Sequence, residues 1–206
     1  MAAREARKWS RRAAGIAAAG AALVGATPAF AHVTAGLGGG TAAGFLHPLT
    51  GLDHMLAMVS VGIWGAQLGA PCIWLLPIAF PMIMATGAVL GILGMPLPGA
   101  ETLIALSVLT LGAMVALQQR LPTALALLAV GIFAVAHGHA HGAEMPDAAN
   151  ALSFTVGFVV ATGLLHATGI VIGLIARWPS GAIALRACGL LVGVAGCYFI
   201  YETVGA

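Results

Sequence analysis

Two short stretches of the sequence contain most of the side chains that could bind a metal ion. The first, HPLTGLDH at 47–54, precedes the apolar run MLAMVSVGIWGAQLG. On one continuous helix His47 and His54 would share a face with Met58, and Asp53 would lie about 100° from His54. Ionisable groups inside an apolar segment are costly and are therefore candidates for function. The stretch predicts a polar site at the start of a membrane helix.

The second stretch is HGHAHGAE at 137–144. If it is helical, His137, His141 and Glu144 share one face and His139 points elsewhere; in a loop all four could gather. Imidazole nitrogens with a carboxylate suit Ni²⁺, Zn²⁺, Cu²⁺ or Co²⁺ better than Mg²⁺ or Ca²⁺. His166, in a later apolar segment, is a weaker candidate, as is Met58 in the first. The alternative is a purely structural hydrogen-bond network, but two such stretches favour metal binding.

The composition places these residues in a membrane protein. The chain is 61% hydrophobic and 7% charged, with a mean hydropathy of +1.04, and a soluble domain needs more charge on its surface. Six apolar segments of bilayer length can be laid out, and only helices satisfy their own backbone in lipid. We therefore expect an all-α bundle of six transmembrane helices, at about 43–68, 72–94, 100–118, 121–138, 149–176 and 181–203.

Residues 1–31 predict a cleaved signal peptide. Basic residues precede an alanine-rich apolar segment, which ends in the A-x-A sequence Ala29-Phe30-Ala31. Cleavage would leave 32–206 as a single six-helix transmembrane domain with His32 at its N-terminus. A terminal amine beside an imidazole can hold a divalent metal, so His32 is a further weak candidate. The alternative is an uncleaved first membrane helix.

The remaining charges predict an orientation. With the mature N-terminus in the periplasm, all basic residues beyond 31 fall on the cytoplasmic side, as the positive-inside rule expects: Arg120, Arg177 and Arg186. Acidic residues fall on or near the periplasmic side: Glu101, Glu144, Asp147 and Glu202. Both histidine stretches lie on that same side, so we expect them to form one site.

Other functional classes lack their sequence signals. There is no basic patch for nucleic acid, no H-E-x-x-H motif and no glycine-rich phosphate loop, so an enzyme is not expected. The three cysteines have no metal-type spacing and make no disulfide framework. A haem would need two histidines on facing helices, which leaves the other histidines and acids unexplained. We expect no prosthetic group.

Glycines predict where the helices approach closely. Gly87 and Gly91 form a G-x-x-x-G pattern in the second predicted span. Similar contacts are expected at glycines of the last two predicted spans: Gly157, Gly163, Gly189, Gly193 and Gly196.

The two histidine stretches resemble those of a known family. GFLHPLTGLDHMLAMVSVGIWGAQLG at 44–69 and HGHAHGAEMP at 137–146 are similar to the HupE/UreJ family of bacterial nickel permeases and accessory proteins, linked to hydrogenase and urease maturation. The family's functional residues map onto a subset of the candidates: His47, Asp53, His54, His137 and Glu144. The family pattern has an aromatic residue before the first histidine of the second motif, where this chain has Ala136.

The resemblance implies import of Ni²⁺, or Co²⁺, across the bacterial inner membrane for a nickel metalloenzyme such as hydrogenase or urease. An ion in transit needs incomplete, exchangeable ligand shells. The alternative is a non-transporting accessory protein or metalloenzyme, in which the same ligands form one rigid site. Association into a homo-oligomer is left open.

Overall fold

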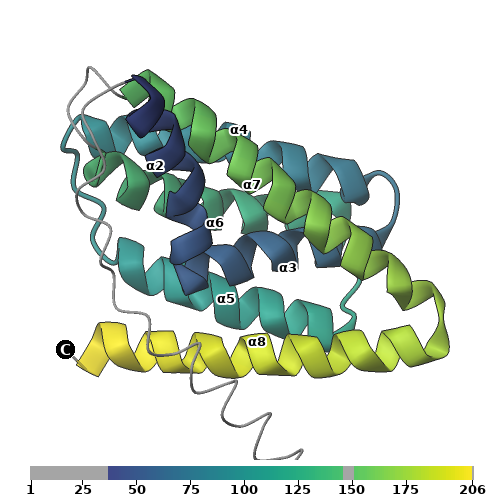
Figure 1. Cartoon of the computed structure of the whole chain (residues 1–206). Coiled ribbons are helices and arrows are strands. Elements are labelled where there is room, and N and C mark those ends of the chain that lie inside the picture. The colour runs from purple at the N-terminus through teal and green to yellow at the C-terminus, as the bar shows by residue number, and fades with distance from the viewer. Residues whose placement is uncertain (1–36, 146–150, 206) are drawn as a thin grey trace, which may run out of the picture. The chain divides into compact units, whose positions relative to one another are not determined.

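The described part of the chain is entirely helical. The computed structural model describes residues 37–145 and 151–205 (Figure 1), and no strand occurs among them. The elements in chain order are α2 (Leu37–Thr50), α3 (Leu52–Leu68), α4 (Cys72–Ile92), α5 (Ala100–Leu117), α6 (Thr123–Ala143), α7 (Ala151–Gly173), the 3-10 turn η2 (Leu174–Arg177) and α8 (Pro179–Gly205). The all-α prediction is confirmed. The predicted signal peptide, His32 and Asp147 lie outside the described residues.

Five of the described helices are long and apolar enough to cross a bilayer: α4, α5, α6, α7 continued through η2, and α8. Their outward faces are also apolar, with large side chains such as Met82, Val171 and Leu191 about 70% exposed. A soluble protein rarely exposes contiguous apolar surface of this kind, whereas lipid favours it. The structure therefore supports a polytopic membrane protein.

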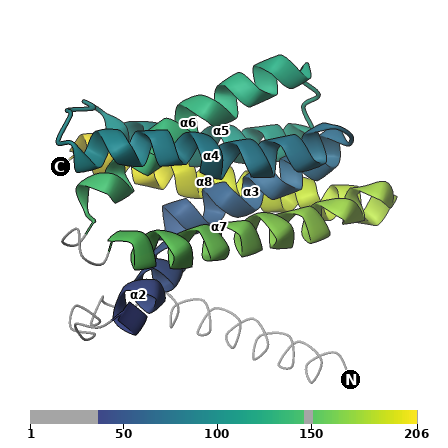
Figure 2. The same cartoon turned by 90° about the horizontal axis from the view of Figure 1, so that it is seen from above.

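The first predicted span, 43–68, is two helices rather than one. Helix α2 ends at Thr50, and Gly51 is extended, with φ −81° and ψ 107°. Pro48 lies within α2 and has no N–H to donate to the preceding turn, which weakens the helix just before the break. Figures 1 and 2 show α2 turning away from the direction of α3. The expectation that His47 and His54 share one face of a continuous helix is therefore wrong.

Glycine allows the backbones of α4 and α6 to touch. A Cβ at Gly87 or Gly91 of α4 would collide with backbone of α6, and one at Gly138 of α6 would collide with the Met84 carbonyl of α4. The predicted contact at Gly87 and Gly91 is thus confirmed. Gly163 was predicted to make a similar contact, but a Cβ there would meet no described atom within 4 Å. Gly163 lies on an outward face of α7, so that prediction is wrong.

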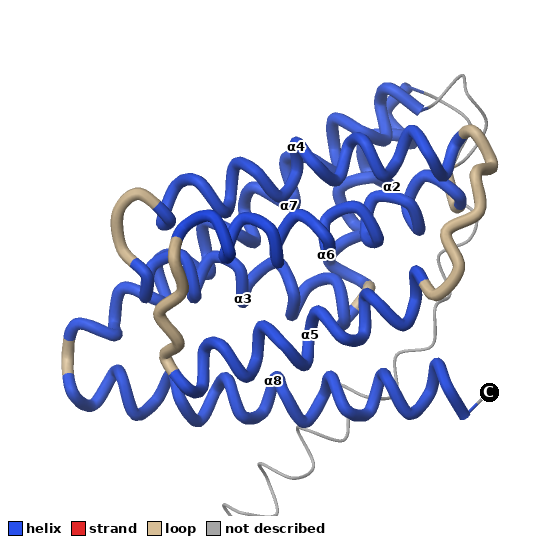
Figure 3. The backbone as a smooth tube through the Cα atoms, turned by 180° about the vertical axis from the view of Figure 1, so that it is seen from behind, coloured by secondary structure: helices blue, strands red, loops and turns tan. Residues whose placement is uncertain are grey.

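The bundle has two ends of different character. The α4–α5 loop lies at one end and the α3–α4 and α5–α6 loops at the other (Figure 3). Helix α6 begins just after Arg120 and ends just before Glu144, and its 21 residues span about 30 Å. The second histidine stretch is therefore at the end opposite Arg120.

Candidate metal centre

Four histidine rings from three helices form one cluster, which we call the four-histidine cluster: His47 of α2, His54 of α3, and His137 and His141 of α6. The ring centroids are 4.7 Å apart for His47 and His141, 4.4 Å for His54 and His141, and 4.9 Å for His54 and His137. Residues 47–54 and 137–141 are therefore brought together, as the sequence predicted. Rings at these separations pack directly against one another.

The break at Gly51 determines how His47 and His54 are positioned in this cluster. Because α2 and α3 are separate helices, His47 and His54 approach α6 from two directions instead of from one face. A Cβ at Gly51 would lie 3.1 Å from His54 Nδ1 and 3.3 Å from Asp53 Oδ1. The missing side chain leaves room for the Asp53–His54 pair.

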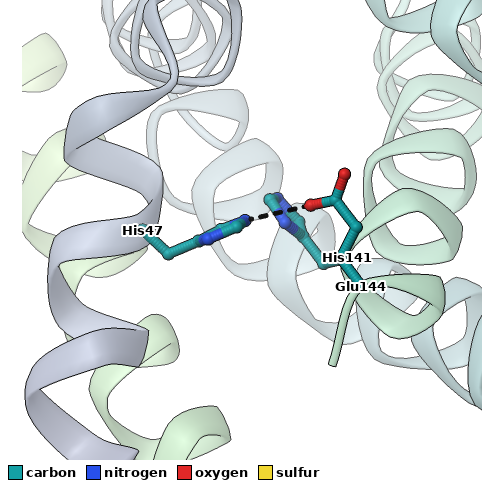
Figure 4. A group of neighbouring side chains, drawn as sticks. All are labelled: His47, His141 and Glu144. Atoms are coloured by element: carbon teal, nitrogen blue, oxygen red, sulfur yellow. Dashed lines mark ion pairs between the residues drawn. The ribbon is translucent and has the colours of Figure 1, made fainter. Parts of the chain in front are cut away.

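His47, the buried His141 and the exposed Glu144 lie together at one side of the cluster (Figure 4). Each of these residues offers a ligand atom within 4.8 Å of the others. His47 Nε2 lies 3.6 Å from Glu144 Oε2. A carboxylate with two imidazoles is a donor set suited to a borderline divalent transition metal.

Two histidines of the cluster are held by acceptors on one ring nitrogen. His54 Nδ1 is 2.7 Å from Asp53 Oδ1, and His137 Nδ1 is 2.8 Å from the Phe133 carbonyl. An ionised carboxylate or a carbonyl can only accept, so each Nδ1 donates and each Nε2 carries the free lone pair. Both Nε2 atoms are buried and find no hydrogen-bond partner among the described residues. Metal-binding histidines are typically oriented in this way, with Nδ1 on a carboxylate or carbonyl.

His141 lies at the centre of the cluster. Its ring contacts those of His47, His54 and Phe158, and its side chain is almost completely buried. Neither of its nitrogens makes a hydrogen bond within the described part of the chain. A buried polar atom without a partner is unfavourable. A bound ion would give a ring nitrogen of His141 the partner that it lacks.

Asp53 makes its hydrogen bonds to His54. Its Oδ1 accepts from both the backbone N–H of His54, at 2.8 Å, and the His54 ring. The carboxylate therefore fixes the position of His54 and supplies negative charge beside it.

Three predicted candidates lie apart from the cluster. His139 is on another face of α6, where its Nε2 donates to the Met95 carbonyl at 2.7 Å and ties the α4–α5 loop to α6. Met58, on α3, is fully buried in the hydrophobic core of the bundle. His166 is buried on α7, where it contacts Phe80.

Two further residues belong to the surroundings of the cluster although the sequence did not single them out. Glu101, in the first turn of α5, lies near enough to His54, Asp53 and Glu144 for its charge to act on them. Phe80 of α4 packs its ring 5.5 Å from that of His137. Glu101 could have been suspected as an acidic residue at the start of a predicted span, whereas nothing in the sequence marks Phe80 among other apolar residues.

Comparison with known proteins finds sequence similarity over most of the chain. The family model described as "HupE / UreJ protein" matches residues 20–199. The chain is also 47% identical over 178 residues to Protein HupE of Rhizobium leguminosarum bv. viciae, a similarity that covers 82% of this chain and 93% of the relative. No solved structure matches. The matched region contains every residue of the four-histidine cluster.

Proposed function

The chain belongs to the HupE/UreJ family, and on that premise we propose that it is an inner-membrane permease for Ni²⁺, or Co²⁺, that supplies a nickel metalloenzyme such as hydrogenase or urease. Proteins of this family are nickel accessory or transport proteins linked to those enzymes, and they are not enzymes themselves. The observation that carries the proposal is the four-histidine cluster, in which free ring nitrogens of His54, His137 and His141 are buried and have no partner among the described residues.

The burial of these residues supports a path for an ion. The Glu144 side chain is 64% exposed, His47 33%, and His54 13%, while His137 has no exposed surface. An ion entering at the acidic edge would exchange its water ligands for imidazole nitrogens in steps. Gradual replacement of the hydration shell lowers the cost of entering the bundle, and no single set of ligands holds the ion too tightly to leave.

The residues around this path have separable roles. Glu144 and Glu101 attract a dication to the entrance by Coulomb attraction. His47, the most exposed of the four, then provides the first imidazole ligand, and His54, His141 and His137 provide more deeply buried ones. Asp53 keeps Nε2 of His54 free to bind.

We also propose the membrane topology predicted from the sequence. The broken pair α2–α3 would make the first of six crossings, as discontinuous helices do in transporters that bind ions near the middle of the membrane. The four-histidine cluster would face the periplasm, and Arg120, Arg177 and Arg186 the cytoplasm. Residues 1–31 would act as the signal peptide that sets this orientation.

Uptake of radioactive nickel by cells with and without the protein tests the proposal. Expression should raise Ni²⁺ accumulation, and competition by excess Co²⁺, Zn²⁺ or Cu²⁺ would show which of these ions share the path. A protein that binds Ni²⁺ stoichiometrically after purification, yet leaves accumulation unchanged, would instead be a non-transporting accessory protein. A homo-oligomer would be detected by mass measurement of the same purified sample.

A further inference from the structure

A second group of buried polar atoms lies on α7, outside the four-histidine cluster. Thr162 and His166 are one helical turn apart on the buried face of that helix, and they are 0% and 1% exposed. Thr162 Oγ1 and both ring nitrogens of His166 make no hydrogen bond to the described residues. Unpaired polar atoms at this depth in a membrane helix are costly and call for a partner.

The neighbouring helix α4 supplies an acceptor to the same place. Pro81 has no N–H, so the Pro77 carbonyl one turn earlier lacks its usual helical donor. The ring of His166 lies near this carbonyl without meeting hydrogen-bond geometry. A ring nitrogen, a hydroxyl oxygen and a free carbonyl oxygen are thus available from two helices.

Phe80 separates this group from the four-histidine cluster. Its ring packs edge-on against His137 at 5.5 Å and against His166 at 5.4 Å. The phenyl ring, itself fully buried, therefore contacts the deepest histidine of the cluster on α6 and the isolated histidine of α7. An ion released by His137 has one aromatic side chain to pass before it meets the next nitrogen donor.

We propose that His166, with Thr162 and the Pro77 carbonyl, forms a second binding site for a borderline divalent transition-metal ion, reached from the four-histidine cluster past Phe80. This inference rests on the proposed transport function and extends the path of the ion deeper into the bundle. The site has one nitrogen donor and two neutral oxygens, so it binds the ion more weakly than four imidazoles do. Weaker binding at the inner site favours onward release, which a transport path requires.

A cysteine in place of His166 would report directly on an ion at this site. A thiolate bound to Co²⁺ gives a sulfur-to-metal charge-transfer band in the near ultraviolet. Purified His166→Cys protein titrated with Co²⁺ should show this band. The wild type, with its native cysteines, and Thr168→Cys, on the exposed face of α7, should not. Absence of the band in folded His166→Cys protein overturns the proposal.

A second variant tests the same site through transport. His166→Gln keeps a polar side chain of similar size. In proteoliposomes it should lower Ni²⁺ flux at least tenfold while leaving the equilibrium affinity of the four-histidine cluster unchanged. Flux at the wild-type rate contradicts the inner site. If the wild type itself carries no flux, the proposed function fails, and the Co²⁺ band of His166→Cys still decides whether the site binds metal.

Discussion

At the scale of single residues, the main feature of the four-histidine cluster is that the two nitrogens of one imidazole ring have different hydrogen-bond partners. In His54 and His137, Nδ1 is committed to an acceptor and Nε2 is left free. The sequence could identify the two stretches that come together, because their position at one end of the spans is visible in it, but it did not separate His139 from the histidines that gather. It could not show that Asp53 serves His54 rather than the ion, because that depends on the short Asp53–His54 contact in the folded chain.

Asp53→Asn tests this role of the carboxylate. The amide keeps the shape of Asp53 but removes the charge that holds Nδ1–H of His54. We expect Ni²⁺ affinity to fall by about 10–100-fold, as for other second-sphere partners of metal-bound histidines. Titration calorimetry on purified protein measures this, with Glu202→Gln on the exposed surface of α8 as the matched control. Equal affinities of the two variants would show that Asp53 does not orient a ligand.

His141 and His139, two residues apart on α6, should respond differently to removal. His141→Ala takes away the central ring of the cluster and should abolish high-affinity Ni²⁺ binding. His139→Ala removes only the hydrogen bond to the Met95 carbonyl, so it should leave binding intact and lower stability by about 1 kcal/mol. Metal titration and thermal unfolding of both variants provide the measurements. Loss of binding in His139→Ala would mean that His139 is a ligand after all.

At the scale of elements, the structure differs from the sequence prediction where proline and glycine interrupt a helix within a continuous apolar segment. Hydrophobicity runs almost unbroken through 43–68, so periodicity alone predicted one helix there. Pro48 and extended Gly51 divide it instead. The sequence leaves the second histidine stretch at a helix end or in a loop, and in the structure it is helical up to Ala143.

The α4–α6 contact was predictable from Gly87 and Gly91, because small residues four apart mark close packing. Gly163 is six residues after Gly157, a spacing that places the two on different faces of a helix, so its outward position could also have been predicted.

Two glycine substitutions measure this difference in packing. Gly138→Ala places a Cβ against the Met84 carbonyl, so α4 and α6 must move apart and the thermal midpoint should fall by several degrees. Gly163→Ala adds a methyl group to an open face and should leave stability unchanged or raise it by about 0.5–1 kcal/mol, through the better helix propensity of alanine. A similar midpoint for both variants would be inconsistent with the α4–α6 backbone contact.

At the scale of the whole molecule, charge and burial are arranged from one end of the bundle to the other. Asp53, Glu101 and Glu144 surround the histidines at one end. At the other end, a cavity of about 320 Å³ is lined by residues that include Arg120 and Arg177. Two guanidinium groups make that cavity unfavourable for a cation, which supports the proposal that an ion enters at the acidic end. The sequence predicted this separation of charge because so few charged residues remain in the spans.

Labelling from outside the cell tests the proposed orientation. Pro98→Cys lies in the α4–α5 loop at the histidine end, and Gln119→Cys lies in the α5–α6 loop at the arginine end; both positions are exposed. A membrane-impermeant maleimide should modify Pro98→Cys in spheroplasts and should reach Gln119→Cys only after lysis. The unsubstituted protein gives the background of the native cysteines. The reverse labelling pattern would invert the topology and place the four-histidine cluster in the cytoplasm.

The central claim is that the four-histidine cluster lies on a path that carries Ni²⁺ across the membrane. The most direct measurement is Ni²⁺ influx into proteoliposomes, followed by an enclosed nickel-sensitive dye, for the wild type and for folded His54→Ala protein. We predict saturable influx for the wild type and a loss of at least tenfold for His54→Ala. Equal influx for the two proteins, or no influx for wild-type protein that binds Ni²⁺ tightly, would contradict the account.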